Sequence, residues 1–437
     1  ALIVAASHLS VAVVNWTVTL NVPPQTLSRL ALEEGIPDRM RTLVAVPCLL
    51  NSEAEVAELV ESLEIRYLAN RDPNLYFALL SDFTDAPAQT MPTDAPLLAA
   101  AVAGIRALNA THEPDGPPRF CLLHRDRTWN EREGVWMGRE RKRGKLIELN
   151  RFLRGQQAPD FHLLVGDEAI LRGVTYVIAL DADTQLPPQS ASRLVATLAH
   201  PLNRPRYDRK RHRVVEGYGV LQPRVSVGAS RESASALARL HSDEIALDPY
   251  TRVVSDVYQD LYAEASFVGK GIYDVDAFLL ATGARFPDNL ILSHDLLEGS
   301  YARTGLASDV ELFEHHPDRY STEMRRRHRW TRGDWQLLPF VVAPGSGLNL
   351  LGRFKMLDNL RRSLVPAALL VLLLNGWLLG VRPIYWTALV MGVLFASPVL
   401  ISLKHFLARN PRMELRLHFE LNREAMARRL QQTALLL

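Results

Sequence analysis

The sequence predicts an α/β fold, in which a mostly parallel, doubly wound sheet is followed by apolar helices. Three observations carry this prediction. Between about residues 38 and 340, apolar strand-like runs alternate with amphipathic helix-like segments, and this alternation is typical of a parallel sheet. Strand-like runs end in aspartates, at the sheet edge where doubly wound folds bind ligands. Two uncharged runs, 363–381 and 383–403, each have roughly the 20 residues that a helix needs to cross a bilayer.

The central region supplies the strands and helices of the predicted sheet. The strand-like segments are RTLVAVPCLL, LYFALLSDFTDAP, RFCLLHRD and TYVIALDADTQLPP. An amphipathic segment with Ser52 as its N-cap follows the first of them, and the helix-like QSASRLVATLAH follows the fourth. The basic segment 203–213 is interpreted as a solvated loop before the strand GYGVLQPRV, and a polyanion-binding role is the less favoured alternative.

Composition narrows the class of protein. The chain has 437 residues, enough for a catalytic domain plus additional segments. Its 50 Lys and Arg residues nearly balance its 48 Asp and Glu residues, and a net charge of +2 does not suggest a nucleic-acid binder. Two cysteines, Cys48 and Cys121, give neither a disulfide framework nor a zinc site and fit a reducing compartment. The chain starts at Ala1 and stops in TALLL, so we expect a piece of a longer protein.

The two uncharged runs predict a transmembrane helical hairpin over residues 363–403, with Arg382 between them. Basic residues flank the hairpin, namely Arg353, Lys355, Arg361 and Arg362 before it and Lys404, Arg409 and Arg412 after it. The positive-inside rule then places both flanks, and the central region, in the cytoplasm. The alternative is two buried helices of a soluble domain.

Three other segments complete the predicted organisation. Residues 1–28 contain no Lys, Arg, Asp or Glu and predict a membrane helix, or a helix that lies on the membrane surface. Residues 346–362 include LGRFKMLDNL, which predicts an amphipathic helix at the membrane surface, with an ordinary surface helix as the alternative. Residues 404–437 are predicted to form a cytoplasmic basic segment that leads to a further, truncated element.

Asp181 and Asp183 are the first candidate site residues. They follow the fourth strand-like run, and residues i and i+2 of an extended chain face the same way. Two such carboxylates can ligate Mg²⁺ or Mn²⁺ and leave positions open for phosphate oxygens. Asp82 and Asp85 end another strand on the same expected edge, where a carboxylate can accept hydrogen bonds from a base or ribose. A capped turn is the alternative for this second pair.

Asp295 follows an apolar run and is a candidate general base, although a lone acidic residue at a helix start is more often an N-cap. Downstream, EMRRRHRWTRGDWQ contains Arg329 and Trp330. Arginine can bind a diphosphate through two hydrogen bonds, and tryptophan offers a face for a sugar ring. A basic patch beside the membrane is a compatible interpretation. Lys145, near a helix start, is a candidate phosphate partner, and Lys270 lies between two glycines that allow a close ligand approach.

The order of these motifs resembles membrane-embedded processive glycosyltransferases of the cellulose synthase type. The chain is most similar to the cyclic β-1,2-glucan synthases (glycosyltransferase family 84), in the segments LLSDFTDAP, RGKLIELNRFLRG, IALDADTQLP, SFVGKGIYDVDAF and LLEGSYAR. The resemblance implies a cytoplasmic GT-A-like domain over residues 37–345, in a multi-pass protein of the inner membrane of Gram-negative bacteria. It further implies an inverting transfer of glucose from UDP-glucose to a growing β-1,2-glucan chain that is later cyclised.

The resemblance also implies roles for single residues. Asp82 matches the first nucleotide-binding aspartate, and Asp181 and Asp183 match the D-x-D motif that holds the metal and the diphosphate. Asp295 matches the catalytic base. Outside these matched positions, Lys145 is predicted on the nucleotide-sugar side and Lys270 on the acceptor side, with a purely structural role as the alternative for each.

Arg329 and Trp330 match the R-W motif, with Arg329 on the diphosphate and Trp330 on the acceptor glucose. Two positions depart from the wider pattern, because Ser293-His294 replaces Thr-Glu and Arg326 replaces Gln. The family's C-terminal phosphorylase-like domain, which governs chain length, is absent from this sequence, so ring formation by this piece alone is not expected. Two alternatives remain open, a processive synthase of β-1,3 or β-1,4 chains and a membrane-anchored nucleotide-sugar-binding scaffold.

Overall fold

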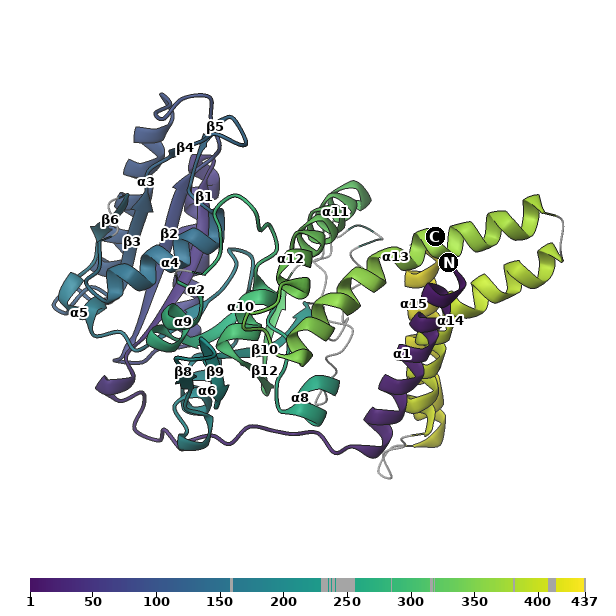
Figure 1. Cartoon of the computed structure of the whole chain (residues 1–437). Helices are drawn as coiled ribbons and strands as arrows, with labels where there is room; N and C mark the ends of the chain where they lie inside the picture. Colours follow the sequence, from purple (N-terminus) through teal and green to yellow (C-terminus); the bar gives the residue numbers. More distant parts are fainter. Residues whose placement is uncertain are drawn as a thin grey trace.

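A single eight-stranded sheet organises the centre of the chain (Figure 1). The computed structural model describes residues 1–157, 160–228, 256–283, 285–314, 319–379, 382–407 and 414–435, with residues 235, 237, 240 and 317. The strands follow the order β12-β10-β11-β7-β1-β2-β3-β6. The four strands β7, β1, β2 and β3 are parallel to one another, and β10 and β12 form a second parallel pair. The strand β11 is antiparallel to its neighbours β10 and β7, and β6 is antiparallel to its neighbour β3. The predicted α/β class and mostly parallel sheet are therefore confirmed.

The elements have the following bounds. The strands are β1 (Thr42–Leu50), β2 (Leu75–Phe83), β3 (Phe120–Arg125), β4 (Thr128–Asn130), β5 (Val135–Met137), β6 (Phe161–Val165), β7 (Tyr176–Ala179), β8 (Arg206–Asp208), β9 (Arg213–Glu216), β10 (Val220–Val227), β11 (Gly271–Asp274) and β12 (Thr304–Glu314). The helices are α1 (Leu2–Asn21), α2 (Glu53–Ala69), α3 (Asp94–His112), α4 (Arg141–Leu153), α5 (Glu168–Arg172), α6 (Ser190–Leu198), α8 (Val257–Tyr262), α9 (Val275–Thr282), α10 (Asp295–Ala302), α11 (Tyr320–Gln336), α12 (Leu338–Val342), α13 (Leu350–Leu378), α14 (Pro383–Leu407) and α15 (Leu415–Leu435), with short 3₁₀ turns at Asp38–Met40 and Pro201–Asn203.

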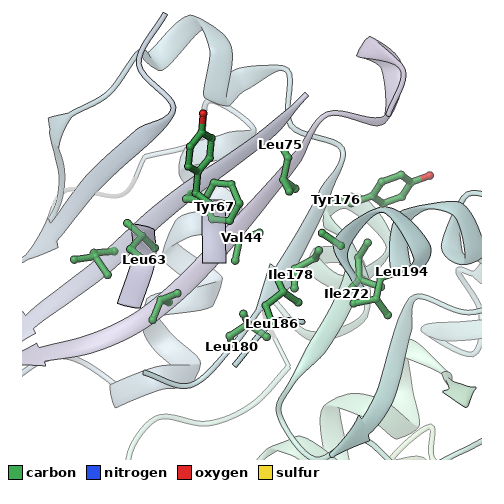
Figure 2. Packing of buried hydrophobic residues seen from close by; sticks show 14 of the residues in the cluster. Val44, Leu63, Tyr67, Leu75, Tyr176, Ile178, Leu180, Leu186, Leu194 and Ile272 are labelled. Atoms are coloured by element: carbon green, nitrogen blue, oxygen red, sulfur yellow. The ribbon is translucent and has the colours of Figure 1, made fainter. Parts of the chain in front are cut away.

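The two faces of the sheet are covered by different helices. Alternate residues of β1 point to opposite faces, so Val44 packs under α2, α3 and α6 while Leu43 packs under α4, α9 and α10. Figure 2 shows the first of these layers, in which Leu63 and Tyr67 of α2 and Leu194 of α6 cover the sheet. Burial on both faces explains why the strands are nearly continuous apolar runs.

Local signals explain where the elements begin. The Ser52 side chain accepts a hydrogen bond from the Glu55 amide at 3.2 Å, which confirms the predicted N-cap of α2. The prediction of a loop over residues 203–213 is wrong in part, because β8 and β9 form a small antiparallel hairpin there. Their charged side chains alternate with Tyr207 and Val214, which pack inward, and a period of two favours a strand.

The helices α1, α14 and α15 lie beside the sheet domain, and α13 connects the two parts, because its first half packs on α10, α11 and α12 and its second half packs on α1 and α14 (Figure 1). The helix α1 packs against α13 and α14 around Ala5, Val365 and Leu369. Among the described residues, only Leu2–Asn21 is both long and apolar enough as a helix to cross a membrane, and a shorter apolar stretch, Pro383–Ala396, lies within α14.

The helices of the structure do not end at the boundary predicted between residues 346–362 and 363–403. One continuous helix, α13, joins the predicted surface helix to the first half of the predicted hairpin. Crossing of the membrane by residues 363–403 stays a prediction. The predicted flanking residues Arg409 and Arg412 lie outside the described residues.

Candidate active site

Three carboxylates meet at the carboxyl end of the central strand β7. Asp181 and Asp183 follow β7, and Glu314 ends β12 on the far edge of the sheet. The loop after β7 reaches β12 because Gln185 bridges to Phe313 and the Thr184 hydroxyl donates to Glu314 at 2.8 Å. Carboxylate oxygens of Asp181, Asp183 and Glu314 lie within 4.8 Å of one another. We call these three residues the acidic cluster.

Two lysines neutralise most of the charge of the acidic cluster. The Lys270 ammonium lies 2.9 Å from Asp181 Oδ2 and 2.5 Å from Glu314 Oε1, and it is largely buried. Lys142, at the start of α4, pairs with Asp181 and donates to the Gly269 carbonyl at 2.8 Å. Lys270 and Gly269 are adjacent, so one short turn before β11 holds both lysines at Asp181.

The electrostatics of the acidic cluster differ from residue to residue. Burial alone would raise the pKa of Asp181, but Lys142 and Lys270 hold it well below the usual range of an aspartate. The pKa of Asp183 is raised by burial and by the charges of Glu314 and Asp181. Burial opposes the charge of Lys270, yet Asp181 and Glu314 raise its pKa, so it stays protonated. Three close carboxylates at a strand end have the donor chemistry of a site for a hard divalent cation.

The candidate base Asp295 lies beside the acidic cluster. A Cβ atom added at Gly269 would come within 2.8 Å of both carboxylate oxygens of Asp295, so the Gly269 backbone touches this carboxylate. Gly269 also accepts the hydrogen bond from Lys142, which pairs with Asp181. Asp295 and Asp181 are thus linked through Gly269 and Lys142.

A buried histidine orients Asp295. His294 Nδ1 lies 2.8 Å from Glu298 Oε2 and 3.3 Å from Asp295 Oδ1, and Glu298 is almost fully buried. Burial disfavours the imidazolium, but Glu298 and Asp295 outweigh it and raise the pKa of His294. The position where the wider synthase pattern has Glu is therefore a histidine between two carboxylates, whose charges favour its protonated form.

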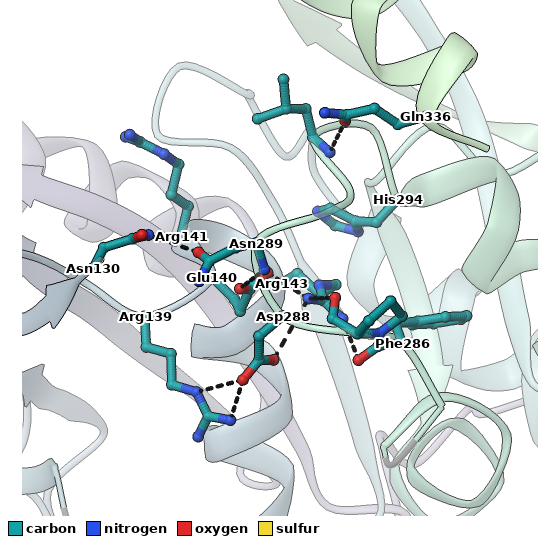
Figure 3. Close-up of polar contacts among 12 residues, drawn as sticks. Asn130, Arg139, Glu140, Arg141, Arg143, Phe286, Asp288, Asn289, His294 and Gln336 are labelled. Carbon is teal, nitrogen blue, oxygen red and sulfur yellow. Dashed lines mark hydrogen bonds and ion pairs between the residues drawn. The ribbon is translucent and has the colours of Figure 1, made fainter. Parts of the chain in front are cut away.

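The segment that leads to Asp295 is tied to the segment that carries Lys142 (Figure 3). The Arg139 guanidinium lies 2.6 Å from Asp288, and the Asn289 amide donates to Glu140 at 2.5 Å. Asn130 donates to the Asn289 side chain at 2.6 Å. These contacts fix the start of α4 against the approach to α10, so Lys142 and Asp295 keep their relative positions.

Arg329 and Trp330 lie on α11, which packs on the residue pair before Asp295. A Cβ atom at Gly333 would lie 2.4 Å from the Ser293 side chain. Residues three and four positions before Gly333 share its helix face, and these are Trp330 and Arg329. Both side chains are exposed, and the Arg326 guanidinium lies 4.8 Å from the centre of the Trp330 ring. The helix that carries the R-W motif thus packs beside the candidate base through Gly333, and contacts of Arg329 with a diphosphate and of Trp330 with an acceptor stay predictions.

The structure places Asp82 and Lys145 in a buried ion cluster. Asp82 is 3% exposed, and its two oxygens accept hydrogen bonds from Arg125 at 3.0 and 2.8 Å. Lys145 Nζ lies 3.1 Å from Asp82 and donates to the Cys48 carbonyl at 2.8 Å. Burial lowers the pKa of Lys145 although Asp82 opposes this, and Lys145 and Arg125 together hold the pKa of Asp82 low against its own burial.

The buried ion cluster also holds the backbone that precedes Lys142. Arg125 also donates to the carbonyls of Arg139 and Arg141 at 2.7 and 3.1 Å. These two residues flank Glu140 directly before Lys142. Asp82 and Lys145 therefore form ion pairs within the protein. A contact of either residue with the nucleotide stays a prediction.

Four residues of the site were missed in the sequence. Glu314 has no motif around it, and long-range contacts of β12, with β10 and with the loop after β7, bring it to Asp181. Lys142 stands in the run RERKRGK, where nothing distinguishes it from its basic neighbours. His294 was noted as a departure from a pattern, but not as a partner of Asp295. Arg125 ends β3, and no role was predicted for it from the sequence.

The sequence of the chain is similar to that of one curated protein. No family model matches the chain. Over 416 residues it is 46% identical to the cyclic beta-(1,2)-glucan synthase NdvB of Rhizobium meliloti (strain 1021). The match covers 94% of this chain and 15% of that protein. Nearly all of the chain is therefore similar to one segment of a cyclic beta-(1,2)-glucan synthase, and the chain spans only 15% of the length of that protein.

Proposed function

We propose that the chain is the glucosyltransferase module of a cyclic β-1,2-glucan synthase. In this proposal it transfers glucose from UDP-glucose, with inversion, to a growing β-1,2-glucan. The observation that supports it most directly is the contact of Asp295 with Gly269, whose carbonyl binds the same Lys142 that pairs with Asp181. A base beside a group of metal-binding type is the arrangement that an inverting transfer requires.

The acidic cluster supplies the donor side of the proposed reaction. Asp181, Asp183 and Glu314 would hold Mg²⁺ or Mn²⁺, and the bound cation would stabilise the charge of the UDP leaving group. Lys142 is the more exposed of the two lysines, so it is suited to bind a diphosphate oxygen. Arg329 would bind the diphosphate from the side of α11.

Asp295 acts on the acceptor side. Its carboxylate accepts the proton of the acceptor 2-hydroxyl while that oxygen bonds to C1 of glucose and the bond from C1 to the diphosphate breaks. His294, fixed by Glu298, would keep the Asp295 carboxylate oriented. Trp330 would stack on the acceptor glucose. Lys270 was predicted on the acceptor side, but its contacts are with the acidic cluster, so its proposed role is to balance charge there.

The larger setting is also a proposal. The R. meliloti relative is far longer than this chain, and we propose that the module works with a C-terminal phosphorylase-like domain of the same protein. We further propose a position at the bacterial inner membrane with a cytoplasmic active site. The apolar helix α1 and the apolar stretch Pro383–Ala396 support membrane attachment.

The role of Asp295 can be tested by separating binding from transfer. Asp295→Asn keeps the shape of the side chain but removes the base, so UDP-glucose affinity should be retained while transfer falls at least ~100-fold. Transfer is measured with radiolabelled UDP-glucose in membranes, and binding by calorimetry. The exposed Asp309→Asn is a matched control. Transfer by Asp295→Asn near the wild-type rate would reject Asp295 as the base.

Linkage analysis of the product distinguishes the β-1,2 assignment from a synthase of β-1,3 or β-1,4 chains. The fold and the site would be shared by all three. A product without β-1,2 bonds would contradict the assignment but leave the roles of the acidic cluster and Asp295 intact.

A further inference from the structure

A second polar site lies away from the acidic cluster, at the junction between the sheet domain and α13. It is a cavity of about 400 Å³. Its lining comes from the turn between β8 and β9, from Arg285 after α9 and from the loop between α12 and α13. The volume falls in the range of small-molecule pockets. The function proposed above does not use it.

The lining of this pocket is strongly basic. Four cationic side chains line it, namely Lys210, Arg211, Arg213 and Arg285, and no lining residue is acidic. The nearest counter-charges are Asp208, 3.8 Å from Arg211, and Glu264, which is shared with Lys355 at 3.6 Å. A surplus of positive charge therefore faces the cavity.

One nitrogen of Arg213 has no hydrogen-bond partner among the residues that the structure describes. This atom, Nη1, is buried. Burial lowers the pKa of Arg213, Glu264 opposes this, and Arg211 and Arg303 add to the lowering. A buried N–H without a partner, repelled by like charges, is stabilised by an anion that accepts its hydrogen bond.

The pocket walls are fixed before any ligand arrives. Arg285 donates to the carbonyls of His212 and Ser346 at 2.9 and 3.2 Å, and it stacks on the Tyr301 ring at 4.2 Å. Tyr301 also donates to the Ser346 carbonyl at 2.5 Å. Gly347 has φ +81°, and a Cβ atom there would come within 3.1 Å of both Arg285 and the Arg211 carbonyl. Only glycine allows the two walls to approach this closely.

We propose that this pocket binds a phosphate-bearing anion. Arginine side chains match the geometry of a phosphate through paired hydrogen bonds, and a cavity of this size leaves room for an organic group attached to the phosphate. The source is either a phospholipid head group or a soluble phosphate ester. The chemistry that the pocket recognises is the same for both.

The test uses inorganic pyrophosphate as the probe and the full chain in neutral detergent. EDTA is present, so that no divalent cation draws the probe to the acidic cluster. Wild-type protein should bind one equivalent of pyrophosphate in calorimetry. Arg211→Ala should weaken binding roughly tenfold, because it removes one charge-assisted contact. Arg209→Ala is the matched control, because Arg209 is exposed, carries the same charge in the same turn and does not line the pocket.

The two variants distinguish binding of pyrophosphate in this pocket from nonspecific binding to positive surface charge. Equal loss in Arg211→Ala and Arg209→Ala, or the absence of saturable binding, would overturn the proposal. Unchanged melting temperatures of the variants show that both are folded. In a second arm, micelles doped with phosphatidylglycerol or phosphatidylcholine compete with pyrophosphate. Competition by phosphatidylglycerol alone, lost in Arg211→Ala, assigns a lipid, and binding of pyrophosphate that neither lipid displaces assigns a soluble ester.

Discussion

Lys270→Met tests whether the acidic cluster is held together by its buried lysine. Methionine keeps the length and apolar stem of lysine but removes the charge that contacts Asp181 at 2.9 Å and Glu314 at 2.5 Å. At an effective dielectric constant of about 20, a contact of roughly 3 Å between unit charges is worth ~5 kcal/mol before desolvation. Removing one partner of a buried pair typically costs ~3–5 kcal/mol in net stability.

The expected loss lies at the lower end of that range. The Asp181 side chain is 37% exposed, and solvent screens its interaction. We therefore expect the free energy of unfolding to fall by ~3 kcal/mol. With an unfolding entropy of ~2.1 cal/mol/K per residue over roughly 300 residues, this corresponds to a melting temperature lowered by ~5 °C.

The assay is thermal unfolding followed by intrinsic fluorescence, with and without Mg²⁺ or Mn²⁺. A divalent cation supplies the charge that Lys270→Met lacks, so it should raise the melting temperature of the variant more than that of the wild type. Arg209→Met, at an exposed position, controls for the loss of a positive charge. A variant as stable as the wild type, or one that divalent cations do not stabilise further, would refute this account of the cluster.

Three further predictions concern the acceptor side. Gly269→Ala should lower turnover ~100-fold with a smaller effect on UDP-glucose binding, since its Cβ atom would displace the Asp295 carboxylate; rate and affinity are measured separately. His294 has a pKa raised by Glu298 and Asp295 against the effect of burial, so the stability that its charge provides is complete below the unfolded pKa of about 6.5 and is lost as pH rises through the folded pKa. His294→Gln should remove this loss from melting curves recorded between pH 6 and 9. Trp330→Ala should raise the acceptor KM about 2–10-fold while UDP-glucose hydrolysis without acceptor persists, because only the stacking surface is lost.

Each of these predictions has a control or a result that would contradict it. Gly134→Ala introduces the same backbone strain at φ +65° with no atom within 4 Å, so a similar loss of turnover there would show that strain alone is responsible. Parallel pH curves for wild type and His294→Gln would exclude the proposed ion pairing. Trp335→Ala alters another exposed tryptophan of α11, and an equal change in acceptor KM would show that Trp330 has no special role.

Local sequence patterns were sufficient to predict the central strands of the sheet and the position of Asp181 at a strand end. The continuous apolar run before Asp181 predicted a strand, and this strand, β7, is buried in the middle of the sheet. The rule that ligands lie at the carboxyl ends of parallel strands then predicted the position of Asp181. The small hairpin of β8 and β9 was missed because its many charged side chains concealed the alternation of Tyr207 and Val214.

The rest of the site depends on contacts that are distant in the sequence. Glu314 reaches Asp181 through the edge strand β12, and no pattern near Glu314 encodes that strand order. Lys142 and Lys145 lie on the same first turns of α4, and helix rotation decides which of them faces the site. Lys145 points into the protein toward Asp82, so the lysine at the acidic cluster is Lys142. Sequence alone does not fix that rotation, because both faces of α4 carry charged residues.

The two lysines of the acidic cluster differ in a way that bears on how a donor would bind. Three carboxylates and two ammonium groups leave a net charge of −1 (−3 + 2). Lys270 is largely buried and pairs with two carboxylates, so moving it would leave both uncompensated. Lys142 is more exposed and pairs with Asp181 and one carbonyl, so under the proposed function it would be the lysine that moves if a divalent cation bound to the cluster. It would then be a free ammonium group at the entrance of the cluster, suited to bind the diphosphate of the proposed donor.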